Sequence, residues 1–187
     1  MTPLRVAVVG VGHLGKEHAR IVASLPDADL VAIVDPNEAQ ARAIAERCGS
    51  HAVTDHRAVL DQVDAAVIAA PTTYHHAVAV DFLRKGVPVL VEKPITSTIT
   101  QARELVELAR AREVVLQVGH IERFNRRSRT LQTRPLQPCY LRAERRRFTG
   151  RSTDVGVVFD LMIHDLDLVL ALGRRPDPPS MRLASVC

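Results

Sequence analysis

The sequence contains no tryptophan, and aromatic residues make up 3% of its 187 residues. Nucleic-acid binding is therefore a poor fit, because few side chains could stack on bases and no zinc-finger or helix-turn-helix pattern occurs. Hydrophobic residues nevertheless make up 47% of the chain. The core must then be aliphatic, a composition typical of parallel sheets buried under helices on both faces.

Long apolar runs and paired cysteines are also missing. No run approaches the ~20 residues that a membrane span needs. The apolar start, Leu4 to Val11, has no small-residue cleavage site of the kind that follows a signal peptide. The three cysteines, Cys48, Cys139 and Cys187, lack metal-ligand spacing, which predicts free thiols in a reducing compartment. We therefore expect a cytoplasmic protein without membrane contact.

Lysine is scarce, at three residues against 22 arginines, and the net charge is +4. Ten arginines and no lysine lie between Arg123 and Arg151. A solvated strand and loop face is the simpler interpretation of this cluster. The functional alternative is an attractive field for an anionic ligand such as a sugar nucleotide diphosphate.

Strand and helix patterns alternate along residues 1–118. Asn37 is a plausible N-cap for one of the helices, and Gly49 its C-terminal stop. The predicted strands are Arg5–Val9, Leu30–Val34, Ala52–Thr54, Ala65–Ala69, Val87–Val91 and Val114–Val118. The predicted helices are His13–Ser24, Glu38–Cys48, Arg57–Gln62, Tyr74–Lys85 and Thr100–Arg112. Six strands with intervening helices predict an α/β fold with a doubly wound parallel Rossmann sheet.

The pattern changes in residues 119–187. A polar stretch comes first, then a charged strand at Cys139–Phe148, an apolar helix at Asp154–Leu172 and a strand at Ser180–Val186. Two strands are marginal cover for an apolar helix. We therefore predict a dinucleotide-binding domain at 1–118 and an incomplete α+β substrate and dimerisation domain at 119–187.

A glycine-rich turn follows the first predicted strand and opens the first helix. Gly10 permits the tight turn, Gly12 lets the backbone approach a pyrophosphate, and Gly15 lets helix and strand pack closely. Free amides at the start of the helix, around His13 and Leu14, would bind the anion. Asp35 ends the second strand, 25 residues after Gly10. Its carboxylate can accept both ribose hydroxyls and would repel a 2′-phosphate, which favours NAD over NADP; a mere helix-flanking role is the alternative.

Lys93 follows the fifth predicted strand within Glu92-Lys93-Pro94. Open α/β sheets bind ligands at the carboxyl ends of their strands. In an arginine-rich chain, a lysine at such a place indicates proton chemistry, because lysine can shift its pKa and arginine cannot. Chance codon usage is the alternative. The Lys93–Pro94 bond is also a candidate cis peptide.

The predicted apolar helix carries one polar stripe. At about 100° per residue, Asp160, His164 and Asp167 fall within about 60° of one another. A carboxylate four residues from a histidine can fix its tautomer and raise its basicity, as a general base requires. A buried histidine satisfied by an aspartate is the alternative. A metal site is not predicted, because the helix offers too few ligands.

A third polar group follows the sixth predicted strand. His120, Arg123 and Asn125, with Glu122, could line the cleft from the domain junction and contact substrate. A helix cap and an exposed surface are the alternative interpretation.

Together these motifs resemble the Gfo/Idh/MocA oxidoreductases. The matching segments are Gly10–Gly15, Asp35, Pro71–His75, Glu92–Pro94 and Asp160–His164. The resemblance implies that Lys93 and His164 flank the reacting carbinol as catalytic residues, with Asp160 contacting substrate or orienting His164. It also implies that Thr72, His75 and Glu92 lie near the nicotinamide half of NAD.

The segments after residue 118 look most similar to a nucleotide-sugar branch that includes UDP-N-acetylglucosamine 3-dehydrogenases. The resemblance thus implies an NAD-dependent dehydrogenase for a sugar or nucleotide-sugar carbinol, with the 3-hydroxyl of UDP-N-acetylglucosamine as one candidate. Family members continue through a larger second domain that carries the subunit interface, so a homo-oligomer is expected where that domain is complete. The alternatives are an impaired NAD-binding module, a redox-sensing regulator, or a reductase for a non-sugar substrate such as a tetrapyrrole.

Overall fold

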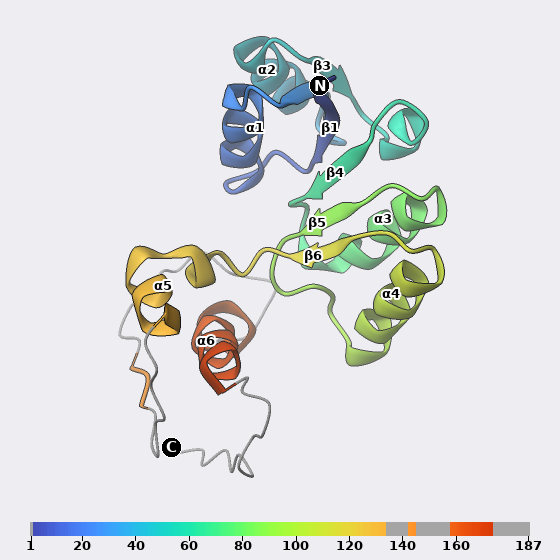
Figure 1. Ribbon diagram of the computed structural model, residues 1–187. Coiled ribbons are helices and arrows are strands. Elements are labelled where there is room, and N and C mark those ends of the chain that lie inside the picture. The colour runs from blue at the N-terminus through green and yellow to red at the C-terminus, as the bar shows by residue number, and fades with distance from the viewer. Residues whose placement is uncertain (1, 134–141, 145–157, 174–187) are drawn as a thin grey trace. The chain divides into compact units, whose positions relative to one another are not determined.

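A six-stranded, all-parallel sheet forms the first of two units, Met1–Gly119 and His120–Cys187 (Figure 1). The computed structural model describes residues 2–133, 142–144 and 158–173. The strands are β1 (Leu4–Val9), β2 (Ala28–Val34), β3 (His51–Val53), β4 (Ala65–Ile68), β5 (Val89–Val91) and β6 (Leu116–Val118). Their order in the sheet is β3-β2-β1-β4-β5-β6. From β1 the chain adds β2 and β3 on one side, and then crosses over to add β4, β5 and β6 on the other side. This doubly wound order confirms the predicted Rossmann sheet.

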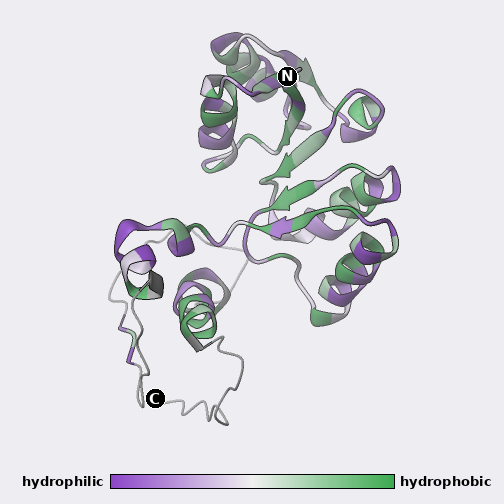
Figure 2. Ribbon diagram, viewed as in Figure 1, coloured by the Kyte–Doolittle hydropathy of each residue, from purple (hydrophilic) through white to green (hydrophobic). Residues whose placement is uncertain are grey.

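Alternating side chains of β1 supply the cores on both faces of the sheet. Val6 and Val8 pack with α1 (Gly15–Ser24) and α2 (Glu38–Cys48). Ala7 and Val9 pack on the opposite face with α3 (Thr72–Arg84) and α4 (Ile99–Ala111). Burial of both faces explains why the strands read as continuous apolar runs. Figure 2 shows this as mostly hydrophobic strands beside helices that carry both colours.

The described core is aliphatic except for a few side chains such as Phe82, which is fully buried. No helix within the described ranges is long and apolar enough to cross a membrane. Cys48 is a free thiol, whereas Cys139 and Cys187 lie outside the described residues.

The predicted limits of α2 are confirmed by its caps. The Asn37 side chain accepts a hydrogen bond from the Gln40 N–H, and Gly49 ends the helix with a φ of 67°. The predicted helix Arg57–Gln62 is wrong, because the chain forms only a 3-10 turn, η1 (His56–Val59). Asp55 caps that turn by accepting from the Arg57 N–H, and so short a segment gains too few hydrogen bonds to offset α-helix nucleation.

The described part of the second unit consists of short helices. The 3-10 turn η2 (Ile121–Phe124) precedes α5 (Arg126–Thr133), and the π-helical turn η3 (Val158–Met162) leads into α6 (Ile163–Gly173). The expected common face for Asp160, His164 and Asp167 assumed α-helical rotation throughout. The structure differs at the start of this segment, where Val158–Met162, which include Asp160, form a π-turn that closes over five residues rather than four. The common face of the three side chains stays a prediction. The strand expected at 139–148 lies outside the described residues except 142–144, which are not in a strand, and the one at 180–186 lies wholly outside.

The glycine turn after β1 brings two backbone segments into close approach. The Gly10 N–H donates to the Val34 carbonyl at 2.7 Å, and Gly10 has a φ of 82°. A Cβ atom added at Gly15 would lie 1.7 Å from the Gly10 carbonyl oxygen. A Cβ at Gly12 would meet nothing within 4 Å. The two glycines therefore serve different purposes: Gly15 permits packing, and Gly12 borders open space.

We expect Gly15→Ala to lower the free energy of unfolding by about 1–3 kcal/mol or more, the usual cost of overpacking a tight site. Gly12→Ala is the matched control and should stay within about 0.5 kcal/mol of the parent chain. Urea unfolding followed by circular dichroism measures both. Equal stability of the two variants would contradict the close approach at Gly15.

Candidate cofactor and active site

Asp35 ties the glycine turn to the end of β2. Its Oδ2 accepts a hydrogen bond from the Val11 N–H at 3.0 Å, and its Oδ1 accepts from the Asn37 N–H at 2.9 Å. Gln40 donates to the Val11 carbonyl at 2.8 Å from the same side. A carboxylate has about four lone-pair sites, so both oxygens keep capacity for ribose hydroxyls. The structure therefore brings Asp35 and the glycine turn together, whereas the contact of Asp35 with ribose stays a prediction.

The start of α1 suits a pyrophosphate. No side chain caps this helix at Leu14. The N–H groups of Lys16 and Glu17 donate to the Gly12 and Leu14 carbonyls, so those of His13, Leu14 and Gly15 are the ones that can meet an anion, as in dinucleotide-binding domains. His13 and Leu14 are exposed beside Gly12, where a Cβ would meet nothing. An uncapped helix start next to open space is what a bound dinucleotide requires, so these residues fit the cofactor.

Glu92 lies at the carboxyl end of β5 and is buried, with 6% of its surface exposed. Its Oε1 lies 2.8 Å from Nε2 of His18 on α1, and its Oε2 accepts from the Lys93 N–H at 3.1 Å. Gly119, after β6, leaves the space that the carboxylate fills: a Cβ there would lie 3.1 Å from it. Burial by itself would raise the pKa of Glu92. The hydrogen bond and charge of His18, together with Lys93, outweigh burial and lower the pKa.

His75 and Thr72 come from the first turn and a half of α3, and both are buried. The His75 ring lies between two backbone carbonyl oxygens. Its Nδ1 is 2.9 Å from the oxygen of Pro94, and its Nε2 is 2.7 Å from that of Ala70. The Lys93–Pro94 peptide is cis, as the sequence predicted. His75 thus contacts the loops that follow β4 and β5, whereas its proximity to nicotinamide stays a prediction.

In the second unit, Arg123 binds Asp167. Its Nε donates to Oδ2 of Asp167 at 2.6 Å, and its Nη2 donates to the other carboxylate oxygen. The hydrogen bond to Asp167 raises the pKa of Arg123. Asp167 is 7% exposed, and Nε2 of His120 lies 3.8 Å from it. The guanidinium predicted to contact substrate is therefore already engaged by a nearly buried carboxylate.

Asn125 caps α5. Its Oδ1 accepts from the Arg127 N–H at 3.0 Å, and its backbone carbonyl accepts from the Arg129 N–H. This geometry supports the helix-cap interpretation of Asn125. Asp160 lies in η3 and His164 in the first turn of α6, both half-buried. The proposed pairing of His164 with Lys93 joins residues of different units and stays a prediction.

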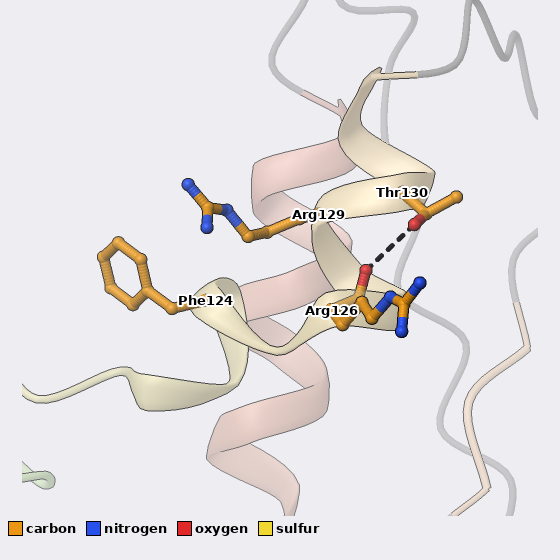
Figure 3. Close-up of a pocket in the computed structure, with 4 residues that line it drawn as sticks. All are labelled: Phe124, Arg126, Arg129 and Thr130. Atoms are coloured by element: carbon orange, nitrogen blue, oxygen red, sulfur yellow. Dashed lines mark hydrogen bonds between the residues drawn. The ribbon is translucent and has the colours of Figure 1, made fainter.

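Arginines of α5 border a shallow hollow in the second unit (Figure 3). Phe124 and Arg129 project to one side of the turn, and Arg126 and Thr130 lie on the other. The Thr130 hydroxyl donates to the Arg126 carbonyl at 2.9 Å. Phe124 is 63% exposed. An exposed aromatic ring beside guanidinium groups can contact both a base and a phosphate.

Sequence reasoning missed His18 and Gly119. The available clue was Glu92 itself, since a carboxylate at the end of a buried strand needs a partner. His18 follows Gly15 by one helical turn, but its direction depends on how α1 packs on the sheet. In the parts of the chain that the structure describes, no group of three His, Cys, Asp or Glu side chains could hold a metal ion.

We expect the stabilisation from ionised Glu92 to be fully present well above pH 4.5 and to fall as pH drops. The reason is that its folded pKa lies below the reference value of 4.5, so the folded state binds fewer protons. Urea unfolding of the parent and of Glu92→Gln, from about pH 7 to about pH 4, measures this. The stability gap between them should shrink with falling pH. Glu46→Gln, at an exposed site, controls for the loss of one negative charge. A difference in free energy of unfolding between the parent and Glu92→Gln that grows with falling pH would refute the lowered pKa of Glu92.

Comparison with known proteins places this chain in a family. Residues 4–120 match Gfo/Idh/MocA, an oxidoreductase family with an NAD-binding Rossmann fold. The chain is 40% identical over 179 residues to UDP-N-acetylglucosamine 3-dehydrogenase of Acidithiobacillus ferrooxidans, covering 94% of this chain and 56% of that protein. It is also 39% identical over 127 residues to inositol 2-dehydrogenase of Corynebacterium glutamicum, covering 65% of this chain and 38% of that one.

Solved structures agree with these relatives. The crystal structure of the Acidithiobacillus ferrooxidans enzyme GnnA aligns with a TM-score of 0.85 and 41% identity, over 92% of this chain and 57% of that one. GenD2 from gentamicin A biosynthesis, solved in complex with NAD, aligns with a TM-score of 0.68 and 33% identity, over 71% and 38%. The chain thus spans just over half the length of its nucleotide-sugar relative. By sequence and by fold, it belongs to the Gfo/Idh/MocA oxidoreductases and carries their NAD-binding Rossmann domain.

Proposed function

We propose that the chain supplies the cofactor and lysine half of an NAD-dependent dehydrogenase acting on a sugar or nucleotide-sugar ring carbinol. The observation that carries this proposal is the shared edge of the sheet. The glycine turn follows β1, and the Lys93 turn follows β5, both at the carboxyl ends of strands in one parallel sheet. Open α/β sheets bind ligands at this edge, near the point where the strand order reverses.

In the proposed reaction the carbinol loses a hydride to NAD and a proton to His164. When bound, NAD accepts the hydride at C4 of its nicotinamide as the carbinol C–H bond breaks. The Lys93 ammonium stabilises the oxygen on which negative charge develops. His164 takes the hydroxyl proton, and the carbinol becomes a ketone. Asp160 lies in a π-helical turn, a feature frequent at functional sites, and is assigned to contact substrate or orient His164.

A nucleotide sugar is the substrate class that we favour. One relative of 40% identity is a UDP-N-acetylglucosamine 3-dehydrogenase, and the match extends beyond the Rossmann domain to 94% of the chain. Arg129, which projects to the same side as the exposed Phe124, supports an anionic, aromatic ligand group over a neutral polyol. The 3-hydroxyl of the sugar is the position proposed for oxidation.

Asp35 should set the preference for NAD over NADP. We expect Asp35→Asn to weaken NADH binding and to improve NADPH binding, because the amide keeps an acceptor for the Val11 N–H but no longer repels a 2′-phosphate. The ratio of the two dissociation constants should change about tenfold or more, which corresponds to about 1.4 kcal/mol. Fluorescence titration with each reduced cofactor measures it. Asp29→Asn, at the opposite end of β2, is the control, and an unchanged ratio in Asp35→Asn would remove Asp35 from the ribose site.

Lys93 should matter for turnover and little for cofactor binding. We expect Lys93→Met to lower kcat about 10²–10³-fold, the usual effect of removing one group that stabilises a developing oxyanion. The dissociation constant for NADH should stay within about twofold. NAD reduction with UDP-N-acetylglucosamine, inositols and hexoses provides the assay. Lys85→Met is the matched control. Lys85 follows the last turn of α3, and its Nζ lies 2.8 Å from Oδ1 of Asp61.

Two outcomes of this assay would overturn the proposal. Full turnover by Lys93→Met would remove Lys93 from the reaction. Tight NADH binding by the parent chain without turnover of any of these substrates would favour the alternative, a cofactor-binding module or redox-sensing regulator.

A further inference from the structure

Both neighbours of Lys93 in the chain are held by a histidine. Glu92, on one side, is bound through its carboxylate by His18 of α1. Pro94, on the other side, is bound through its carbonyl oxygen by His75 of α3. These helices cover opposite faces of the sheet. The turn that carries Lys93 is therefore held by helices on both faces of the sheet.

The His18 contact is relayed directly to the lysine backbone. Glu92 receives the His18 Nε2 on one oxygen and the Lys93 N–H on the other. Glu92 is only 6% exposed, so water cannot readily replace either partner. Gly119 lies on the third side, where a Cβ atom would come within 3.1 Å of the carboxylate. Loss of the His18 donor would leave a buried acceptor without a protein donor and let the carboxylate turn away from Lys93.

The His75 contact joins two loops across the sheet edge. Its ring is 1% exposed, and each nitrogen faces a carbonyl oxygen, of Pro94 or of Ala70. Carbonyl oxygens only accept, so a neutral imidazole can donate to one of them and a doubly protonated ring can donate to both. A side chain that served only to fill the core would be apolar at so buried a place. The polar ring instead fixes the distance between the turns after β4 and β5.

We propose that His18 and His75 are positioning residues for Lys93, His18 acting through the Glu92 carboxylate and His75 through the Pro94 carbonyl. The catalytic meaning of this arrangement rests on the proposed function, in which Lys93 contacts the reacting oxygen. The arrangement itself is a statement about the Lys93 turn and can be tested without turnover.

Amide side chains separate the individual contacts. The amide nitrogen of asparagine occupies nearly the place of histidine Nδ1, and that of glutamine nearly the place of Nε2. His75→Asn therefore keeps a donor toward Pro94, His75→Gln keeps one toward Ala70, and His75→Leu keeps neither. By the same logic His18→Gln keeps the donor to Glu92, and His18→Leu removes it. His76→Asn is the control, because His76 is the next residue of α3 and pairs instead with Glu104 at 2.8 Å.

The three lysines of the chain make the readout simple. Reductive methylation with carbon-13 formaldehyde retains their charge and gives one NMR signal for each of Lys16, Lys85 and Lys93 besides that of the N-terminal amine; Lys→Arg variants assign the three lysine signals. We expect the Lys93 signal to move in His75→Leu, His75→Gln and His18→Leu. It should stay near its parent position in His75→Asn, His18→Gln and His76→Asn. The Lys85 signal should stay fixed throughout, which distinguishes a displaced turn from general unfolding.

Kinetics supply the second measurement. Displacement of Lys93 should lower kcat about 10–100-fold in His75→Gln relative to His75→Asn, because small misplacements of a reacting group cost that much. The KM for NAD should stay within about twofold. Identical Lys93 signals in His75→Asn, His75→Gln and His75→Leu would overturn the role of His75, and identical signals in His18→Gln and His18→Leu that of His18. A displaced Lys93 signal combined with full turnover by Lys93→Met would instead retain the positioning and reject the catalytic role.

Discussion

The carboxylate of Glu92 is a charged group almost removed from water, and the elements around it are arranged to satisfy it. A buried ion without partners would cost several kcal/mol. Its two partners are His18 of α1 and the backbone N–H of Lys93, and Gly119 leaves room for the carboxylate because it has no side chain. These lie far apart in the sequence, yet they meet at the carboxyl ends of β5 and β6. Satisfying one carboxylate therefore fixes the first helix, the lysine turn and the end of the sheet together.

The two turns at this edge follow a common logic. In the glycine turn, Asp35 accepts the Val11 N–H, and in the lysine turn, Glu92 accepts the Lys93 N–H. In each case an acidic side chain at the end of one strand holds a backbone segment that a ligand must approach. The carboxylates act on the backbone as well as on any ligand. Each carboxylate therefore holds its turn in place in addition to any contact with a ligand.

The elements of the sheet could be predicted because each has a strong local pattern. Continuous apolar runs gave the buried strands, and Asn37 and Gly49 mark the ends of α2 through their own backbone preferences. The predicted helix at Arg57–Gln62 was wrong because six residues are too short for an α-helix to compete with the 3-10 turn that Asp55 caps. The π-turn at Val158–Met162 could not be predicted, because residue types that favour an α-helix are equally compatible with a π-turn.

The candidate site divides in the same way. The glycines, Asp35 and the Lys93 turn were predictable because each is anchored to the end of one predicted element. The partners of His18, His75 and Arg123 were not, because a side-chain contact between distant segments depends on packing that periodicity does not specify. Resemblance to a family named His75 and Glu92 as site residues. That both hold the backbone of the same turn is visible only in the structure.

The arginines after residue 118 are not equivalent as a source of attraction for an anion. The charge of Arg123 is largely compensated, because a nearly buried aspartate binds it through two hydrogen bonds. In contrast, α5 carries Arg126, Arg127 and Arg129 and no acidic residue. At physiological ionic strength an exposed charge is screened within about 8 Å. Among the arginines that the structure describes in this unit, those of α5 are therefore better placed than Arg123 to attract an anion at close range, and Arg123 instead links η2 to α6 through Asp167.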